Sequence, residues 1–217
     1  MVNTPERRQV RAALPGAQLL VQLSSLPVTL ALPSMARAFG TSVEDAAWLV
    51  IANLLVLGST VFLGARLGDR FGHPRVFIIG TIIITLGAIF IASSQSLTQI
   101  IAFRGLQGLG AGLIHGNGNA MLAFAFKPEE RGRAYAFPIS GSRIGTLIGL
   151  VVFGIFLEFL SWRLVFLTML PVGLLAIKTS MPMLMRNAES ITEKQVPIDY
   201  VGATLLVATA AVFLLSG

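Results

Sequence analysis

The sequence VFIIGTIIITLGAIFIAS, residues 76–93, decides the fold class, because none of its side chains is charged. A helix needs about 20 apolar residues to cross the hydrocarbon core of a bilayer. Backbone polar groups find no water in lipid, so only helices and closed β-barrels span a membrane. Barrel strands alternate in polarity over about 10 residues, and this stretch does not. It therefore predicts a transmembrane helix.

Similar apolar stretches lie on both sides of it. Together they predict seven transmembrane segments, at Leu14–Met35, Ala47–Leu67, Val76–Ser93, Leu97–Phe124, Ala134–Phe159, Leu164–Leu184 and Ile198–Leu215. We expect an all-α membrane protein with a six-helix bundle over residues 1–185, a cytoplasmic linker over residues 186–197, and a seventh, truncated helix over residues 198–217. The short connections near residues 94–96 and 160–163 predict antiparallel neighbours.

The composition agrees with a membrane protein. Of the 217 residues, 54% are hydrophobic and 12% are charged, about half the charged share of a soluble domain. The lack of cysteine excludes a disulfide framework and a thiolate metal site, and the two histidines, His73 and His115, are far apart in sequence. We therefore expect no metal and no cofactor. No nucleophile–histidine–acid set lies in the apolar segments, so an enzyme is not expected.

The positive charges predict the orientation. The net charge of +6 is compatible with nucleic-acid binding, but the charges lie between apolar stretches, as in membrane topology. Only Arg37 and Arg163 fall on one side, whereas Arg104 and Arg143 lie within predicted spans. The other side receives Arg7, Arg8, Arg11, Arg66, Arg70, Arg75, Lys127, Arg131, Arg133, Lys178, Arg186 and Lys194. Because Lys and Arg mark the cytoplasmic side, we expect a multi-pass protein of the cell (inner) membrane with a cytoplasmic N-terminus and no nucleic-acid partner.

The segment ARLGDRFGHPR, residues 65–75, joins the second and third predicted spans. Its glycines permit a tight turn. Asp69 lies among arginines from which a carboxylate can accept charge-assisted hydrogen bonds. The alternative is a basic loop that happens to contain one acid.

At these residues the chain resembles the major facilitator superfamily, whose loop pattern is G-x-L-A-D-R-x-G-R-[RK]. The matching residues are Gly68, Asp69, Arg70 and Gly72. Ala65 replaces the first glycine, and His73 and Pro74 replace the basic pair, with Arg75 next to them. The resemblance implies that the loop latches one conformation of a transporter, with Asp69 as the anion and Arg70 and Arg75 as its candidate partners.

The fourth span contains RGLQGLGAG, residues 104–112. A charge at membrane depth costs about 2.5–3.5 kcal/mol on insertion scales, so Arg104 is expected to face a cavity or a partner. The alternative is an arginine that snorkels to the interface. The segment is similar to the R-x-x-Q-G-x-G-A pattern of the superfamily. That similarity implies a role in proton or substrate coupling for Arg104, with Gln107 and Gly108.

Two stripes of polar residues follow helical spacing. His115 and Asn119 fall on nearly the same side of the fourth span as Arg104. The first span carries the other stripe, which consists of Gln18, Gln22, Ser25 and Thr29. We interpret both as walls of a cavity, with hydrogen bonding between helices as the alternative.

The fifth span contains GSRIGTLIGL, residues 141–150. It resembles the antiporter pattern G-x-x-x-G-P-x-x-G-G, with Thr146 in place of the proline and Leu150 in place of the last glycine. Small residues at this spacing let helices approach closely. The expected packing residues are Gly141, Gly145 and Gly149, and Arg143 is a further candidate for coupling.

The first span extends the resemblance to the drug:proton antiporter branch with fourteen spans. Residues 31–33 match that branch, but Ser24 stands where it has an aspartate. The resemblance implies multidrug-type efflux of small, amphipathic molecules by alternating access, driven by a proton gradient. Such transporters bind substrate between two halves, so the missing C-terminal half is an expected partner. Two alternatives stay open: a metabolite or siderophore exporter with altered coupling, and a truncated half-transporter that does not transport.

Overall fold

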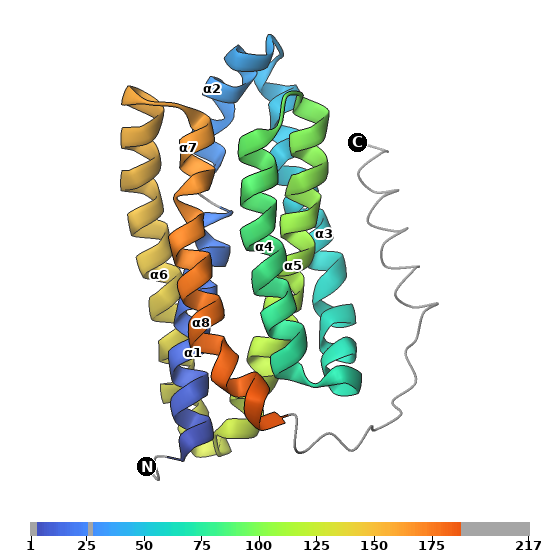
Figure 1. Ribbon diagram of the computed structural model, residues 1–217, viewed down its shortest axis with the longest axis vertical. Helices are drawn as coiled ribbons and strands as arrows, with labels where there is room; N and C mark the ends of the chain where they lie inside the picture. Colours follow the sequence, from blue (N-terminus) through green and yellow to red (C-terminus); the bar gives the residue numbers. More distant parts are fainter. Residues whose placement is uncertain (1–3, 26–27, 188–217) are drawn as a thin grey trace.

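The computed structural model describes residues 4–25 and 28–187, so the predicted seventh helix and most of the predicted linker lie outside the described residues. All regular structure in the described part is helical (Figure 1). The helices are α1 (Pro5–Leu23), α2 (Val28–Phe39), α3 (Val43–Phe71), α4 (His73–Ser93), α5 (Leu97–Ala125), α6 (Pro128–Phe159), α7 (Trp162–Leu167) and α8 (Met169–Asn187).

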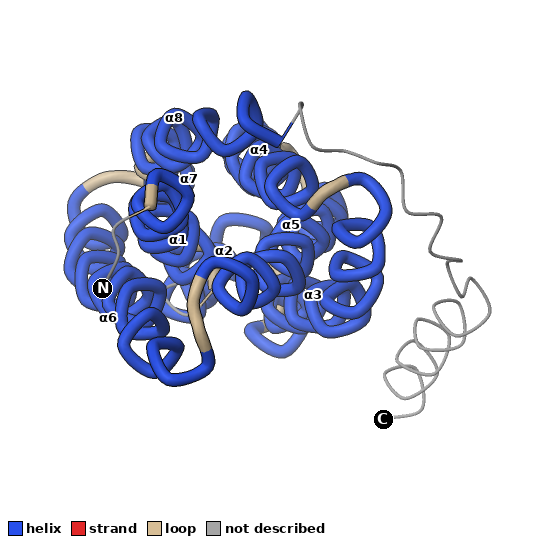
Figure 2. The backbone as a smooth tube through the Cα atoms, turned by 90° about the horizontal axis from the view of Figure 1, so that it is seen from below, coloured by secondary structure: helices blue, strands red, loops and turns tan. Residues whose placement is uncertain are grey.

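The helices form one bundle in which neighbours in space are often distant in sequence. Figure 2, which looks along the bundle, shows α6 and α3 on opposite flanks. Helix α5 packs against both α3 and α4, and α1 packs against both α6 and α8. The start of α1, the α3–α4 turn and the α5–α6 turn all lie at one end, which we call the basic end (Figure 1).

The first and sixth predicted spans are interrupted, so their prediction as continuous helices was wrong. Ser24 ends α1, and its carbonyl accepts a hydrogen bond from the Arg104 guanidinium. Thr168 separates α7 from α8. Pro171 has no N–H with which to bond the carbonyl of Leu167, so the regular helical ladder fails there.

Most helices extend beyond their apolar stretches. Helix α3 has 29 residues and α6 has 32; at 1.5 Å per residue each is about 45 Å long, against a hydrocarbon core of about 30 Å. The side chains of Thr4, Ser42 and Ser96 cap α1, α3 and α5 by accepting backbone N–H groups. The predicted starts at Leu14, Ala47 and Ala134 were late, because α1, α3 and α6 begin in the polar flanking sequence. The predicted start at Leu97 is the start of α5.

The predicted loop at residues 65–75 is almost entirely helical. Helix α3 ends at Phe71 and α4 begins at His73, so Gly72 alone makes the reversal. Its φ of 93° lies in the region that favours glycine. Asp69 consequently sits in the last turn of α3 and not in a loop.

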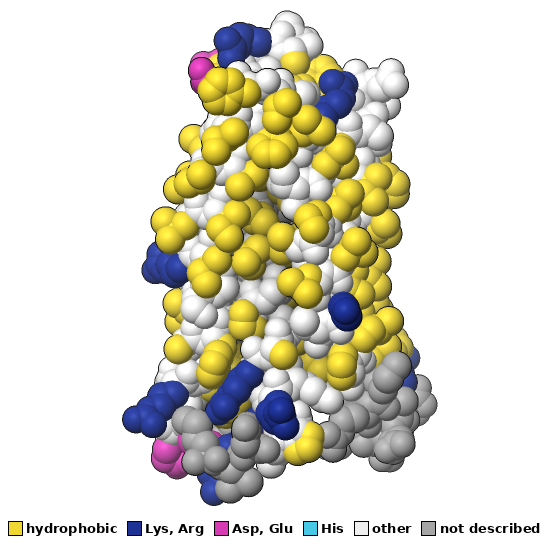
Figure 3. Space-filling model, turned by 60° about the vertical axis from the view of Figure 1, so that its left-hand side comes forward, with side chains coloured by type: hydrophobic (Ala, Val, Ile, Leu, Met, Phe, Trp, Pro, Cys, Tyr) yellow, Lys and Arg dark blue, Asp and Glu magenta, His cyan; other side chains and the backbone are white. Residues whose placement is uncertain are grey.

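The surface confirms a membrane protein. Five helical segments of the described chain, counting α1–α2 and α7–α8 as one each, are long and apolar enough to cross a bilayer. Large apolar side chains such as Phe62, Phe124 and Leu147 are exposed. On the face shown in Figure 3, hydrophobic side chains cover the middle of the bundle, and Lys and Arg side chains gather mainly at the lower end. Helix α5 is not among the five apolar segments; it is enclosed by its neighbours and buries polar side chains.

Glycines set the closest helix contacts. A Cβ built on Gly110 of α5 would lie 2.6 Å from the Gly80 carbonyl oxygen of α4, and one built on Gly80 would lie 2.7 Å from the Gly110 carbonyl oxygen. Neither backbone can give way without separating the two helices. The α4–α5 contact therefore depends on both glycines.

We predict that Gly110→Ala destabilises the protein, because overpacking costs about 1–3 kcal/mol. Gly58→Ala is the matched control, since a Cβ at Gly58 meets no atom within 4 Å. Removing a helical glycine there should stabilise by roughly 0.5–1 kcal/mol. Apparent melting temperatures in detergent measure both. Equal melting of the two variants would contradict the close contact.

Candidate functional site

Arg104 is the centre of the candidate site. Its side chain is fully buried, and it is among the largest buried side chains of the described residues. Its Nε donates to the Leu49 carbonyl of α3 at 2.9 Å, and its Nη1 donates to the Ser24 carbonyl at the end of α1 and to Gln107 Oε1 at 2.8 Å. Asn53 Nδ2 in turn donates to the Arg104 carbonyl at 3.1 Å. The arginine thus does not snorkel; it joins three helices in the interior.

Gln107 extends the hydrogen-bond network from Arg104 to α4 and α8. Its Nε2 donates to the Ile84 carbonyl of α4 at 3.3 Å and lies 4.0 Å from the sulfur of Met169, where α8 begins. Gly108 makes room for the network, because a Cβ there would collide with the Asn53 backbone. All three residues of the predicted coupling motif therefore sit at helix crossings.

The Arg104 charge has no carboxylate partner among the described residues. The Ser24 hydroxyl donates to the Val21 carbonyl at 2.9 Å, so only the Ser24 backbone faces the guanidinium. Within residues 4–25 and 28–187, Arg104 Nη2 and Asn53 Oδ1 have no hydrogen-bond partner. A buried cation that keeps a donor available can respond to an added anion.

The polar stripes of α1 and α5 meet in part. Gln18 Nε2 lies 3.5 Å from His115 Nδ1, and Ser142 Oγ of α6 donates to Gln22 Oε1 at 3.1 Å. The remaining predicted wall residues lie apart from these contacts: Ser25 is half-buried and bonds the Val21 carbonyl, and Thr29 and Asn119 are exposed. The half-buried glutamines and His115 form a polar row between α1, α5 and α6.

The predicted packing face of α6 lies on α1. A Cβ on Gly141 would collide with the Pro15 backbone, and one on Gly145 would lie 2.8 Å from the Leu19 carbonyl oxygen. Gly149 is buried on the same face. Arg143 is exposed near the middle of α6, so the structure does not bring it to Arg104.

At the basic end, the ion-pair partner of Asp69 in the described part of the chain is His73. His73 Nε2 lies 3.4 Å from Asp69 Oδ1, and His73 Nδ1 lies 2.8 Å from Asn117 Oδ1 of α5. Among the predicted partners, the Arg70 guanidinium stacks on the Phe71 ring at 5.3 Å. Sequence reasoning missed His73 and Asn117 as partners, although a polar residue between two glycines in an apolar span is a signal for Asn117.

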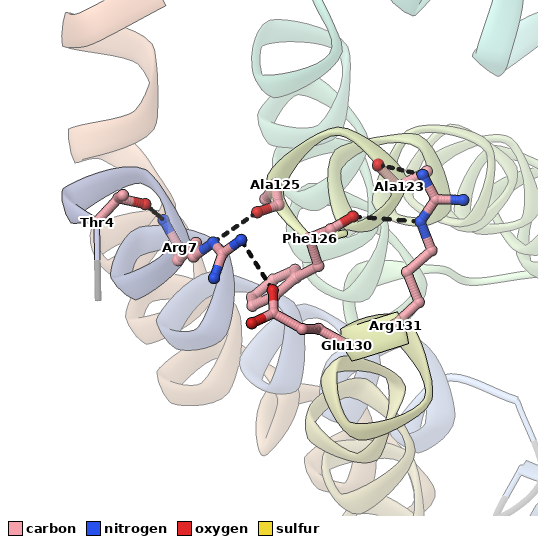
Figure 4. A network of polar contacts seen from close by, with 7 residues as sticks. All are labelled: Thr4, Arg7, Ala123, Ala125, Phe126, Glu130 and Arg131. Atoms are coloured by element: carbon pink, nitrogen blue, oxygen red, sulfur yellow. Dashed lines mark hydrogen bonds and ion pairs between the residues drawn. The ribbon is translucent and has the colours of Figure 1, made fainter. Parts of the chain in front are cut away.

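A second feature missed from the sequence fastens the start of α1 (Figure 4). Arg7 forms an ion pair with Glu130 at 2.8 Å and donates from Nε to the Ala125 carbonyl at 2.8 Å. Its guanidinium also lies over the Phe126 ring, 5.2 Å from the centroid. Arg131 bonds the Ala123 and Phe126 carbonyls. These contacts fix α1 to the α5–α6 turn.

In the described residues, no three His, Asp or Glu side chains gather as metal ligands would. The site is therefore a network of hydrogen bonds around one buried cation, flanked by a polar row and by a charged turn.

Comparisons with known proteins bear on this arrangement. The Major Facilitator Superfamily pattern matches residues 16–215. The chain is 34% identical, over 98% of its length, to EfpA of Mycobacterium tuberculosis, an uncharacterized MFS-type transporter of which it covers 40%. It is 33% identical, over 75% of its length, to the puromycin resistance protein Pur8 of Streptomyces alboniger, of which it covers 32%.

A solved structure gives the same fold. The crystal structure of the peptide transporter POT in complex with sulfate matches with a TM-score of 0.63 and 17% sequence identity, over 97% of this chain and 48% of that one. The chain thus spans less than half the length of the proteins it matches.

We predict that Arg104→Met lowers the melting temperature in detergent. Methionine fills a similar volume but leaves the Ser24 and Leu49 carbonyls without their donor, and a buried unsatisfied group costs about 1–3 kcal/mol. Arg143→Met, at an exposed arginine near the middle of α6, is the control and should melt near the wild type. Wild-type melting of Arg104→Met would show that its hydrogen bonds do not hold the helices together.

Proposed function

The chain belongs to the major facilitator superfamily, a family of transporters and not of enzymes, and on that premise we propose that its bundle is the N-terminal half of a secondary transporter. The transporter exports small, amphipathic molecules by alternating access and is driven by a proton gradient. The observation that carries the proposal is the buried Arg104 network, which links α1, α3, α4 and α5 around a cation that has no carboxylate partner in the described part of the chain.

The placement of polar groups supports a transport pathway. Gln18, Gln22 and His115 are half-buried, and the Gln18–His115 contact is long, at 3.5 Å. Such groups can exchange their protein contacts for those of a passing substrate at little cost, because the net gain of one hydrogen bond is only about 1 kcal/mol. A multidrug-type substrate range fits this weakly bonded row.

The distribution of positive charge supports an orientation in the membrane and a second half that packs against α6. The basic end carries the α3–α4 and α5–α6 turns, and we place it at the cytoplasmic face of the cell membrane because positive loops stay inside. Arg143 is exposed near the middle of α6, where a charge facing lipid is costly. A second half of the transporter that covers this face of α6 would remove that cost.

Relatives suggest the substrate class. Pur8 is a puromycin resistance protein, and we carry the export of drug-like molecules to this chain as a proposal. Alternating access then requires a bundle that moves as a body against its partner. The Arg104 network and the glycine contacts give the bundle that rigidity.

We predict that Arg104→Ala and Asp69→Asn each slow export of a fluorescent amphipathic dye at least about tenfold in cells that make the full-length protein. Losing one charged hydrogen bond is worth roughly 1.5–3 kcal/mol. Asp45→Asn is the matched control, because this exposed carboxylate lies at the opposite end of α3 and bonds only Thr41 and Ser42 nearby. Membrane levels of each variant are measured by immunoblotting, and unchanged export with normal levels would refute the roles of Arg104 and Asp69.

A second candidate is export with altered ion coupling, as for a metabolite or siderophore exporter. The observation that favours it is Ser24, which offers only a backbone carbonyl to Arg104 where the antiporter branch has an acid. A membrane-embedded acid is the usual proton carrier.

The two candidates differ in proton movement. We expect that adding substrate to proteoliposomes that contain the full-length protein and an internal pH dye changes the internal pH, because antiport must move protons. Liposomes with the Arg104→Ala variant serve as the control. Substrate uptake without a pH change would favour the second candidate.

A further inference from the structure

The imidazole of His73 bridges three helices at the basic end. It lies at the start of α4, with Nε2 3.4 Å from Asp69 Oδ1 in the last turn of α3 and Nδ1 2.8 Å from Asn117 Oδ1 in α5. The His73 side chain is 13% exposed and that of Asp69 is 39% exposed. The ring is thus mostly enclosed, while its carboxylate partner is open to the surroundings.

The hydrogen bonds of Asn117 fix the direction of its amide. Asn117 Nδ2 donates to the Gly64 carbonyl at 2.9 Å and to the Leu113 carbonyl at 2.8 Å. Both partners are acceptors only, so the amide nitrogen must face them and Oδ1 must face His73. An amide oxygen only accepts, and therefore the His73 Nδ1 carries a hydrogen.

The second ring nitrogen then decides the charge. A neutral imidazole with its hydrogen on Nδ1 presents a lone pair from Nε2, and an ionised carboxylate has no hydrogen to donate. Only the imidazolium has N–H groups on both nitrogens and can donate to Asn117 and Asp69 at once. The two contacts of His73 are compatible only when the ring has bound a proton.

We propose that His73 is a proton-binding site that ties the latch carboxylate Asp69 to α5. With the proton bound, the ring donates to Asn117, forms an ion pair with Asp69 and so connects α3, α4 and α5. When the proton leaves Nε2, the lone pair faces the carboxylate and the link to Asp69 is lost. The tie is therefore complete when the ring is an imidazolium and is lost when the ring is neutral.

The surroundings fit a built site. A Cβ on Gly68 would collide with both the Asn117 amide oxygen and His73 Nδ1, so the glycine keeps the space for the bridge. From α5, the ring also meets Phe124, with 5.4 Å between the ring centroids.

The ionisable groups around His73 come from two helices. From α3, Asp69 contacts the ring, and Arg66 and Arg70 lie in the same final turns. From α4, Arg75 follows two residues later. The contacts from α5, Asn117 and Phe124, do not ionise. His115 lies two residues from Asn117 but faces Gln18 of α1, so it is a separate histidine.

The inference goes beyond the proposed export, because it concerns the protonation of the α3–α4 turn and holds for any exported molecule. It also gives the turn a titrating group that the basic residue of the family pattern does not supply.

The direct test is ¹⁵N NMR of the full-length protein labelled at histidine, with the His73 signals assigned by their loss in His73→Gln. At pH 6 we expect both ring nitrogens of His73 to be protonated, and at pH 8 we expect the Nδ1–H form. Asp69→Asn should reduce the doubly protonated fraction at pH 6 several-fold, and Asn117→Leu should shift the neutral form toward Nε2–H. His115→Gln should leave the signals of His73 unchanged. A neutral Nε2–H ring at pH 6, or a charge state indifferent to Asp69→Asn, would overturn the proposal.

The second test needs no transport. The variants are compared in a His115→Gln background, so that His73 is the only histidine that differs among them. In this background the protein with His73 should lose more melting temperature between pH 6 and pH 8 than the proteins with His73→Gln, which has no ionisable ring, or His73→Arg, whose charge is permanent. An equal loss with His73 and with His73→Gln would overturn the proposal. If His73→Gln does not fold, the NMR spectra of the wild type and of Asp69→Asn decide alone.

Discussion

The structure depends on the need to satisfy a guanidinium inside a membrane bundle. Arg104 can remain buried only if acceptors converge on it, and the acceptors are backbone carbonyls at the end of α1 and in α3. The break after α1 is part of that solution, because a carbonyl used by Arg104 is no longer part of the helical ladder. The close α3–α5 crossing at Gly108 is another part, since it lets Asn53 reach the Arg104 carbonyl. One charge thus fixes where a helix ends and how near two others lie.

The departures from the family pattern acquire a physical meaning through these contacts. Ser24 lacks the acid of the antiporter branch, yet Arg104 still bonds that residue through its backbone. Residue 24 therefore supplies Arg104 with a hydrogen-bond acceptor but with no negative charge. At the basic end a permanent charge of the family pattern is also lost, because His73 stands in place of a basic residue. The chain therefore has fewer fixed charges in both places.

The helices and the membrane environment could be predicted from the sequence, because an uncharged stretch such as residues 76–93 is a local property. The candidate residues Arg104 and Asp69 were also local signals, each a charge in an unusual setting. What the sequence did not reveal is which residues meet. Arg104 and Ser24 are 80 positions apart, and Arg7 and Ala125 are 118 apart. Such pairs depend on which helices pack together, and the spacing of residues along one helix does not predict that. A tight turn was predicted within residues 65–75, but not that Gly72 alone makes it, since polar residues at the end of a long helix look like a loop.

The fastening of Arg7 to Glu130 has a consequence for how the chain is made. Synthesis proceeds from the N-terminus, so α1 enters the membrane long before residues 125–130 leave the ribosome. Until then the cation of Arg7 has neither its carboxylate nor the Phe126 ring on which it rests. The first helix is therefore inserted without this fastening, and α2 to α5 follow while it is still absent. The contacts that fix the start of α1 are therefore completed only after the turn between α5 and α6 has been made.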